Sequence, residues 1–349
     1  MEVVDLIREY YEGTVGHLHL EDYEEELVTQ VMELAAAQDT PVSREEVANE
    51  LDVFRFYAPC RTSISCPPAP DAADSVARLD ALPKHAQRTP EWYEVRRNMI
   101  TASSVYKVFG SQAKRNELVV EKCAPVVERA ESDGPRQWGV KFEPISARYY
   151  EHTYGTELRE YGCLAHPTHP FLGASPDGVN VKEGPLFGRM LEIKNPVSRE
   201  ITDDPPEEYW IQIQIQMEVC GLESCDLLQT QFVEYASHRD FVADGTYERT
   251  ADGMPKGIIL QYAVDGKTRY EYPPYLATEE EAAAFEAALP PMEWMTTTYW
   301  RLGKVACTLI ERNRRWFAEA LPQIAEVWTV IEGARVNGFE PYLPKKRRR

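Results

Sequence analysis

Two carboxylates and a lysine near the middle of the chain are the residues whose types and spacing best suit chemistry. Asp177 lies in a Ser-Pro-Asp-Gly run, fourteen residues separate it from Glu192, and Lys194 follows two positions later. Alternate side chains of a strand share a face, so Glu192 and Lys194 project together while Leu191 and Ile193 enter the core. Carboxylates suit Mg²⁺, and a lysine can position water and stabilise negative charge. The pattern therefore predicts Mg²⁺-dependent phosphodiester hydrolysis.

The surrounding elements favour this chemistry over a plain turn followed by a solvated strand face. Residues 211–217 alternate Ile and Gln, which by itself predicts a strand. An acidic, proline-containing segment at 203–208 precedes them and Gly221 follows, which are the start and stop signals of a helix. We therefore expect a helix that places Gln212 and Gln216 one turn apart on one face.

Two upstream motifs add polar and aromatic residues to this set. They are Trp92-x-x-x-Arg96 followed by Ile-Thr-Ala-Ser at 100–103, and Trp138-Gly-x-x-x-Glu143. Ser103 is expected at a helix start, where free N–H groups favour an anion, with Arg96 nearby. The alternatives are a structural salt bridge for Arg96 and a solvated helix position for Glu143. We expect both tryptophans to be packing anchors rather than base-stacking residues.

In this order the motifs resemble those of the lambda-type alkaline exonucleases, the YqaJ-like viral recombinase group of the PD-(D/E)xK nuclease superfamily. The resemblance covers about residues 88–235 and leaves the segments before and after it outside the phage pattern. The long spacing between Asp177 and Glu192 implies an enlarged hairpin. With its helical flanks, the chain most resembles the exonucleases of large eukaryotic DNA viruses.

The resemblance implies roles for the residues of the acidic motifs. Asp177 and Glu192 ligate Mg²⁺, with the Ile193 carbonyl as a third ligand, and Lys194 activates water. Glu143 is similar to the family's additional acidic residue, which contacts a metal directly or through water. The implied cofactor is Mg²⁺, two ions per site, with Mn²⁺ as a substitute.

The resemblance also implies roles outside the acidic motifs. Gln212 matches the glutamine that supports the active site, and Gln214 and Gln216 match less securely. Arg96 and Ser103 match residues that bind the phosphate at a 5′ end of DNA.

The fold implied is an α/β, restriction-endonuclease-like core, with a mixed central sheet flanked by helices and helical N- and C-terminal additions. The function implied is 5′→3′ exonucleolytic digestion of double-stranded DNA ends in viral recombination, repair or genome processing. The resemblance alone suggests a ring-shaped homo-trimer and cooperation with a single-strand-annealing protein. The alternatives are a structure-specific or restriction-like endonuclease and a non-catalytic DNA-binding scaffold, which the intact Asp177, Glu192 and Lys194 disfavour.

The chain divides into five expected segments. They are an acidic helical region (1–58, with a capping box at Ser43 and Glu46), a linker (59–90), the nuclease core (91–275), a helical C-terminal region (276–344, amphipathic over 299–321) and a basic tail (345–349). Within the core we expect helices at 101–109 and 138–154, strands at 157–163, 171–174, 190–194 and 226–233, and a hairpin at 262–272 that turns at Asp265-Gly266.

Composition indicates an intracellular globular protein. The 349 residues are 43% hydrophobic and 27% charged, with a mean hydropathy of -0.46. No apolar run approaches the roughly 20 residues that a membrane span needs, which excludes an integral membrane protein. The acidic start carries no secretory signal, and seven cysteines without a CxxC pair indicate reduced thiols.

The net charge of -19 and a pI near 4.9 do not exclude DNA, because the charge is unevenly distributed. Residues 1–50 hold fourteen Asp or Glu against two Arg, whereas residues 345–349 are all basic. Screening confines each charge to about 8–10 Å, so a local positive surface is compatible with the total. The acidic region is either a solubilising cap or a partner-docking or DNA-mimicking surface. The tail is a nuclear-import signal (placing the protein in the host nucleus or at a viral replication site), a DNA arm or a solubilising tail.

Overall fold

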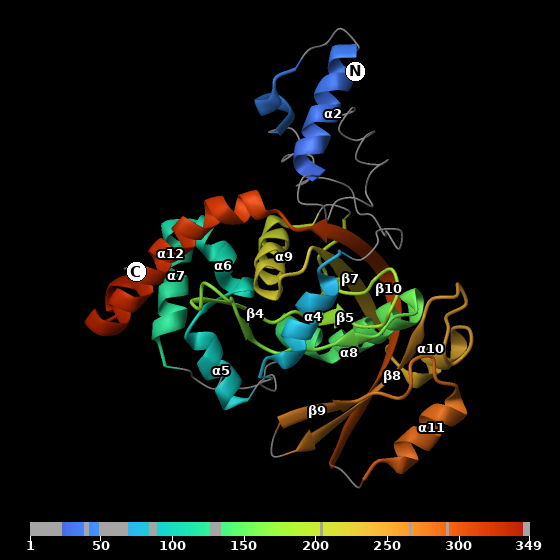
Figure 1. Ribbon diagram of the computed structural model, residues 1–349. Helices are drawn as coiled ribbons and strands as arrows, with labels where there is room; N and C mark the ends of the chain where they lie inside the picture. The colour runs from blue at the N-terminus through green and yellow to red at the C-terminus, as the bar shows by residue number, and fades with distance from the viewer. Residues whose placement is uncertain are drawn as a thin grey trace.

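The computed structural model (Figure 1) describes residues 23–37, 42–48, 69–83, 89–125, 134–202, 205–264, 267–290 and 293–344. Several sequence predictions lie outside these ranges. They concern the first part of the acidic region (1–22), the two aspartates at 203 and 204, the hairpin turn at 265 and 266, and the basic tail at 345–349.

A seven-stranded mixed sheet lies at the centre of the molecule, in the order β2-β5-β6-β7-β10-β8-β9. β6 and β7 run parallel, and the other neighbouring strands run antiparallel. The bounds are β2 Leu158–Arg159, β5 Gly178–Asn180, β6 Met190–Lys194, β7 Ser224–Glu234, β8 Lys256–Val264, β9 Lys267–Glu271 and β10 Glu293–Glu311. A mixed sheet flanked by helices confirms the predicted α/β fold class.

Two helices lie against this sheet and carry candidate residues. They are α8 (Pro135–Tyr154), which packs on β6 and β7, and α9 (Glu207–Cys220). Each ends at a glycine in the left-handed region, Gly155 at φ +62° and Gly221 at φ +67°. The prediction of a helix over 211–217 is confirmed. α9 is buried from Trp210 to Cys220, so it has no solvated polar face, and each glutamine needs its own partner instead.

A small second sheet, in the order β1-β4-β3, brings the upstream motifs close to the main sheet. The elements are α5 (Pro90–Arg97), β1 (Ile100–Thr101), α6 (Ala102–Phe109), β3 (Leu164–Ala165) and β4 (Leu172–Ala174). The helix predicted at 101–109 is confirmed as α6, and β4 leads directly into Ser175. A Cβ at Gly173 would lie 1.9 Å from the sulfur of Met99 and 2.9 Å from the Leu164 carbonyl, so this close approach requires glycine.

The largest hydrophobic core joins four helices. α6 and α9 pack with α7 (Gln112–Cys123) and α12 (Arg314–Asn337), and Figure 1 shows α12 lying along α7. The 3-10 turn η2 (Glu340–Tyr342) follows α12 and packs near α7. Fully buried side chains in this core include Val105, Leu118, Ile213 and Ile324. The core therefore fixes α9 against both flanks of the chain.

The linker expected at 59–90 is wrong in part. Residues Ala72–Ala81 form helix α4, whose Val76 and Leu79 are buried. The prolines before it are typical of a linker, but they precede an alanine-rich segment that has high helix propensity. In the N-terminal region, α2 spans Tyr23–Ala37. The capping box is confirmed, because Ser43 N–H donates to Glu46 Oε2 at 2.8 Å and Glu46 N–H to Ser43 Oγ at 3.2 Å.

The amphipathic helix expected over 299–321 is also wrong in its first half. Residues 293–311 form β10, which pairs with β7 on one side and β8 on the other, and helix α12 begins at Arg314. The segment is rich in Thr and aromatic residues, which favour a strand. The C-terminal region (276–344), expected to be helical, therefore contains a strand of the main sheet as well as helix α11 (Glu279–Ala288) and helix α12.

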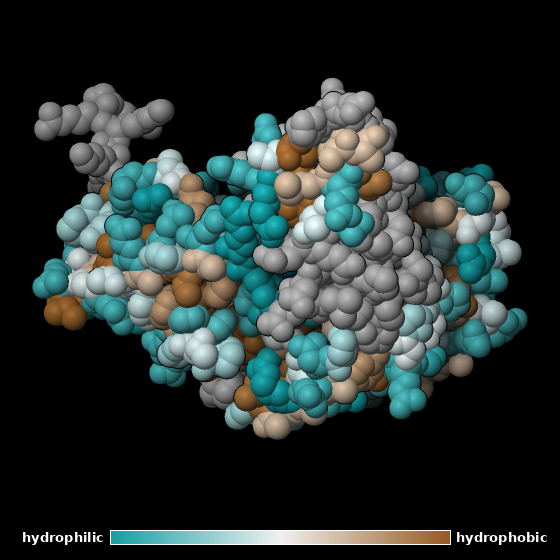
Figure 2. All heavy atoms as spheres, turned by 45° about the horizontal axis from the view of Figure 1, so that its top comes forward, coloured by the Kyte–Doolittle hydropathy of each residue, from teal (hydrophilic) through white to brown (hydrophobic). Residues whose placement is uncertain are grey.

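The remaining predictions differ in extent. The strand at 157–163 is shortened to β2, whereas the hairpin is confirmed as β8 and β9. α10 (His238–Ala243) and α11 cover one side of β8. No helix in the described ranges is long and apolar enough to cross a membrane. The five cysteines within these same ranges are free and buried. On the face drawn in Figure 2, hydrophilic side chains predominate and apolar ones form small patches.

Candidate active site

The β5–β6 hairpin brings the acidic motifs together. Asp177 immediately precedes β5, and the pairing of Gly178 with Leu191 places it beside Glu192. The Ile193 N–H donates to Asp177 Oδ2 at 2.7 Å, which fixes the orientation of that carboxylate. The enlarged hairpin therefore brings Asp177 and Glu192 together, although fourteen residues separate them in the sequence.

Lys194, Glu192 and Gln212 form a closed set of hydrogen bonds. Lys194 Nζ donates to Glu192 Oε1 at 2.5 Å and to Gln212 Oε1 at 3.0 Å. The Gln212 amide nitrogen donates to the same Glu192 oxygen at 2.6 Å. Glu192 is only 2% exposed, and a buried carboxylate is costly unless it is paired and hydrogen-bonded. α9 thus supplies part of the compensation for burying this charge.

Gln216 is a second α9 residue in the same site. Its amide nitrogen donates to Glu192 Oε2 at 2.7 Å and to the Ser175 carbonyl at 3.4 Å. Gln214 lies on another side of the helix, where it donates to the Glu311 carbonyl at 2.7 Å and accepts from Asn313 N–H at 2.6 Å. The family resemblance does not distinguish Gln214 from Gln216, whereas the predicted helix groups Gln216 with Gln212; of the two, only Gln216 contacts Glu192 in the described chain.

The electrostatics of the site are those of carboxylates crowded together. Burial raises the pKa of Asp177 well above its usual range, and the negative charges of Glu192 and Glu143 raise it further. Burial opposes the charge on Lys194, but Glu192 and Asp177 outweigh this and raise the pKa of Lys194. Glu143, on α8, therefore lies close enough to act on Asp177. The site holds three carboxylates against one ammonium, an imbalance that a divalent cation would offset.

The donors in the site fit a hard divalent cation. They are the carboxylates of Asp177, Glu192 and Glu143 and the main-chain carbonyl of Ile193, all oxygen ligands of the kind that Mg²⁺ prefers. Across the ranges that the structure describes, however, no group of three or more His, Cys, Asp or Glu is already arranged to hold a metal ion. The chemistry of the donors fits, and their present arrangement includes hydrogen bonds to Glu192 from Lys194 and α9.

Arg96 lies in a cluster of hydroxyl groups beside the carboxylates. Its guanidinium donates to Ser175 Oγ and Ser103 Oγ, each at 3.2 Å, and to Thr101 Oγ1 at 3.5 Å. The Trp92 ring centroid lies 4.4 Å from the guanidinium carbon. These hydroxyls are neutral, so the cluster combines one positive charge with several hydrogen-bonding groups, which suits an oxyanion. Ser175, two residues before Asp177, connects the cluster to the acidic site.

Three further side chains contribute to the site that the sequence motifs do not predict as functional. Ser175 and Thr101 lie in a turn motif and at a helix start, and their hydroxyls accept hydrogen bonds from Arg96. Tyr209 lies one turn before Gln212 on α9, and its ring centroid is 4.9 Å from Lys194 Nζ and 5.3 Å from the Arg199 guanidinium carbon. Its position three residues from Gln212 was the available signal, because residues three apart share a helix face.

The tryptophans behave as packing residues. Trp92 is 9% exposed and packs with Met99 and Cys163. Trp138 packs on Phe142 with ring centroids 4.6 Å apart. Both contacts agree with the prediction that these rings anchor helices.

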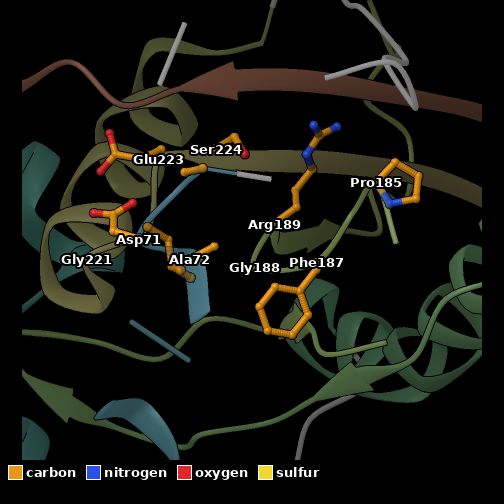
Figure 3. Close-up of a pocket in the computed structure, with 11 residues that line it drawn as sticks. Asp71, Ala72, Pro185, Phe187, Gly188, Arg189, Gly221, Glu223 and Ser224 are labelled. Atoms are coloured by element: carbon orange, nitrogen blue, oxygen red, sulfur yellow. The ribbon is translucent and has the colours of Figure 1, made fainter. Parts of the chain in front are cut away.

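A separate surface pocket, drawn in Figure 3, lies away from the carboxylates. Its lining comes from the start of α4, the β5–β6 connection and the turn between α9 and β7. Arg189 lines it and forms an ion pair with Asp226 at 3.4 Å. A Cβ at Gly188 (φ +77°) would lie 2.7 Å from the Cβ of Ala72, so close packing of α4 requires glycine there. The pocket therefore lies where α4, the β5–β6 connection and the α9–β7 turn pack together.

Comparison with known proteins places these residues in a family context. Residues 91–223 match the model of the YqaJ-like viral recombinase domain. The chain is 30% identical over 300 residues to uncharacterized protein R354 of Acanthamoeba polyphaga mimivirus, an alignment that covers 73% of this chain and 54% of that protein. This chain therefore spans about half the length of that relative.

Two solved structures are also similar to the chain. One is the alkaline exonuclease LHK-Exo from Laribacter hongkongensis, at 21% identity and a TM-score of 0.44, covering 71% of this chain and 95% of that one. The other is a phage related exonuclease from Haemophilus somnus 129PT, at 13% identity and a TM-score of 0.39, covering 67% and 94%.

Proposed function

Because residues 91–223 match the model of the YqaJ-like viral recombinase domain, we propose that the protein is a metal-dependent deoxyribonuclease acting as a 5′→3′ exonuclease on double-stranded DNA. The observation that carries the proposal is the contact of one carboxylate, Glu192, with both Lys194 and Gln212, beside Asp177. Viral recombination, repair or genome processing is the proposed setting.

The side chains of the site divide the work of phosphodiester hydrolysis. Asp177, Glu192, Glu143 and the Ile193 carbonyl would hold Mg²⁺, which supplies Lewis acidity at the phosphate when bound. Lys194 positions the attacking water and stabilises developing negative charge, while Gln212 and Glu192 hold its ammonium in place. We propose two ions per site and substitution by Mn²⁺, to be counted by calorimetric titration of the purified protein.

The Arg96 cluster would bind the phosphate at a 5′ end. A terminal phosphate carries more negative charge than an internal phosphodiester, and a guanidinium surrounded by hydroxyls favours it. Arg96 donates to Ser175, two residues before Asp177, so a phosphate bound at Arg96 would lie close to the acidic site and the first phosphodiester would lie at the carboxylates. This arrangement supports an end-dependent exonuclease over an endonuclease.

The assembly and its partners are part of the proposal. We propose double-stranded ends as substrate, a homo-trimer that encircles DNA, a single-strand-annealing partner, and activity in the host nucleus or at a viral replication site. Sedimentation of the full chain with and without DNA tests the trimer, and a monomer in both conditions contradicts it.

The decisive experiment compares three DNAs with Mg²⁺: 5′-phosphorylated linear duplex, 5′-hydroxyl linear duplex and closed circular duplex. We expect rapid loss of the phosphorylated linear DNA alone. Lys194→Ala should abolish cleavage, with a loss of at least about 100-fold, and retain DNA binding, because it removes the ammonium at the water and leaves the binding surface. Full activity of this variant contradicts the site assignment.

Each other outcome selects an alternative. Cutting of the circle supports the structure-specific or restriction-like endonuclease. Binding without cleavage of any of the three DNAs supports the non-catalytic scaffold.

A further inference from the structure

Arg96, whose guanidinium lies in the hydroxyl cluster, is at the C-terminal end of α5. Two cations from other helices contact that end of the helix. Lys122 Nζ donates to the main-chain carbonyl of Arg96 at 3.2 Å. Arg335, in the last turn of α12, donates to the main-chain carbonyl of Arg97 at 2.5 Å. The last carbonyls of a helix have no intrahelical donor, and positive charge there also interacts favourably with the helix dipole. These two bonds therefore define where α5 ends.

The same contacts join the ends of α5 and α7. The Arg335 guanidinium also donates to the Lys122 carbonyl at 3.2 Å, and the Arg97 guanidinium donates to the Cys123 carbonyl at 2.8 Å. Lys122 and Cys123 are the last two residues of α7. We call Arg97, Lys122, Cys123 and Arg335 the helix-end cluster. It ties three helices together at the backbone of Arg96.

Burial of the Lys122 ammonium costs free energy, which its ion pair and hydrogen bond partly offset. It is 4% exposed, and its ion pair with Glu121 at 3.3 Å accompanies a second pair between Glu121 and Lys107 at 2.8 Å. A buried ammonium is unfavourable unless it is paired and hydrogen-bonded. An apolar side chain would fill this space at lower cost. The charge is instead directed at the carbonyl of the residue whose guanidinium contacts Ser103 and Ser175.

We propose that Lys122 and Arg335 are positioning residues for 5′-phosphate recognition, acting through the backbone of Arg96. Arg96 is held at its carbonyl by Lys122 and at its guanidinium by hydroxyls, so a shift of the end of α5 moves the guanidinium relative to Ser175. Displacements of about 1 Å at a recognition group can cost about 100-fold in rate. Arg335 lies outside the matched residues 91–223, so the C-terminal helix contributes to end recognition. This inference rests on the proposed role of Arg96.

The test measures kcat and KM for 5′-phosphorylated and 5′-hydroxyl linear duplexes in the full-length chain. The variants are Arg335→Met and Lys122→Met, with Arg96→Ala as the reference for a lost pocket. The matched control is Arg315→Met, on the same helix, where Arg315 is exposed and pairs with Glu319 at 3.3 Å.

We expect Arg335→Met and Lys122→Met to lower the preference for phosphorylated ends about tenfold, toward the value of Arg96→Ala, through a raised KM for phosphorylated ends. The kcat on hydroxyl ends should stay within about twofold, and Arg315→Met should keep the wild-type preference. Arg335→Lys, which keeps one donor for the Arg97 carbonyl, should recover part of the preference.

The preference is a ratio within one protein sample, so it does not depend on the fraction that is folded. A purely structural role lowers both rates equally and leaves the ratio unchanged, which overturns the inference. If the wild-type chain itself shows no preference, the proposed role of Arg96 fails and the inference fails with it. A wild-type preference that Arg96→Ala loses and both cluster variants retain overturns the inference alone.

Discussion

At the scale of single residues, the site depends on how a buried carboxylate is stabilised. Lys194 and Gln212 donate hydrogen bonds to Glu192 Oε1, and Gln216 donates to Glu192 Oε2. The glutamines are neutral donors, so they stabilise the carboxylate without adding positive charge that would compete with a metal ion. Residues that hydrogen-bond to the ligands of a metal site hold the ligand oxygens in a fixed orientation.

Gln216→Leu tests this arrangement, because it removes the donor at Glu192 Oε2 and the contact to the Ser175 carbonyl. Removing a residue that orients a metal ligand typically costs about 10- to 100-fold in activity. We expect kcat on phosphorylated linear duplex to fall by that factor. Gln214→Leu is the matched control two residues away. It should keep kcat and lower the free energy of unfolding by about 1–3 kcal/mol, because the Asn313 N–H and Glu311 carbonyl lose their partner. Equal kcat values for the two variants would contradict the role of Gln216.

Sequence spacing was sufficient to bring Asp177, Glu192 and Lys194 together, because strand alternation and a hairpin determine their neighbours. The predicted helix also groups Gln216 with Gln212 on one face and leaves Gln214 on another, which agrees with the structure, whereas the family resemblance alone does not distinguish Gln214 from Gln216. Ser175 was within a recognised motif, yet its contact with Arg96 spans 79 positions of sequence. Contacts of that range depend on tertiary packing, which local patterns do not report.

At the scale of elements, the helix–strand error at 299–311 has a physical cause. The apolar residues of the segment fit one face of a helix, but in the structure residues 300–311 pair with β7, and residues 293–301 of the same strand pair with β8. A strand between two others is stabilised by tertiary hydrogen bonds that outweigh local propensity.

The packing of α12 on the turn between β3 and β4 predicts a pH dependence of stability. His166 stacks on Phe317 of α12, with ring centroids 5.6 Å apart, and its Nδ1 accepts from the N–H groups of Thr168 and His169. Burial, and then the charge of His169, lowers the pKa of His166 to about 4. In the unfolded chain the pKa is about 6.5. Between pH 6.5 and 4 the unfolded state therefore binds more protons, and stability falls as the pH is lowered.

His166→Asn removes the titrating ring and keeps a side-chain acceptor for the turn. We expect the urea midpoint of the wild-type chain to fall more steeply than that of the variant between pH 6.5 and 4. The two proteins should have parallel pH dependences above pH 7. Parallel curves throughout the acidic window would show that another group causes the loss.

At the scale of the whole molecule, segments on both sides of the matched residues 91–223 hold α9 in place. Arg312, between β10 and α12, pairs with Glu218 of α9 at 2.5 Å. From the N-terminal side, Ser75 of α4 donates to the Gly221 carbonyl at 2.7 Å, and Arg78 donates to the carbonyls of Val219, at 3.3 Å, and Cys220. α9, which carries two contacts to Glu192, is therefore held at its C-terminal end by α4, a segment that composition alone predicts to be a linker.

Arg78→Met tests whether α4 is an integral part of the proposed nuclease. The variant keeps the aliphatic stem but leaves the Val219 and Cys220 carbonyls without their charged donor at the end of α9, where positive charge is favourable. Hydrogen bonds from charged groups contribute about 1.5–3 kcal/mol, and we expect a loss of that size in the free energy of unfolding.

The control is Arg159→Met, which breaks the more exposed ion pair between α4 and β2, in which Asp80 and Arg159 lie 2.7 Å apart. This variant should lower the free energy of unfolding by less than about 1 kcal/mol. Because Gln216 lies one turn before Cys220, Arg78→Met should also lower kcat, whereas Arg159→Met should not. If both variants unfold at the same urea concentration and keep the wild-type kcat, α4 is a passive attachment and the matched domain is sufficient for the site.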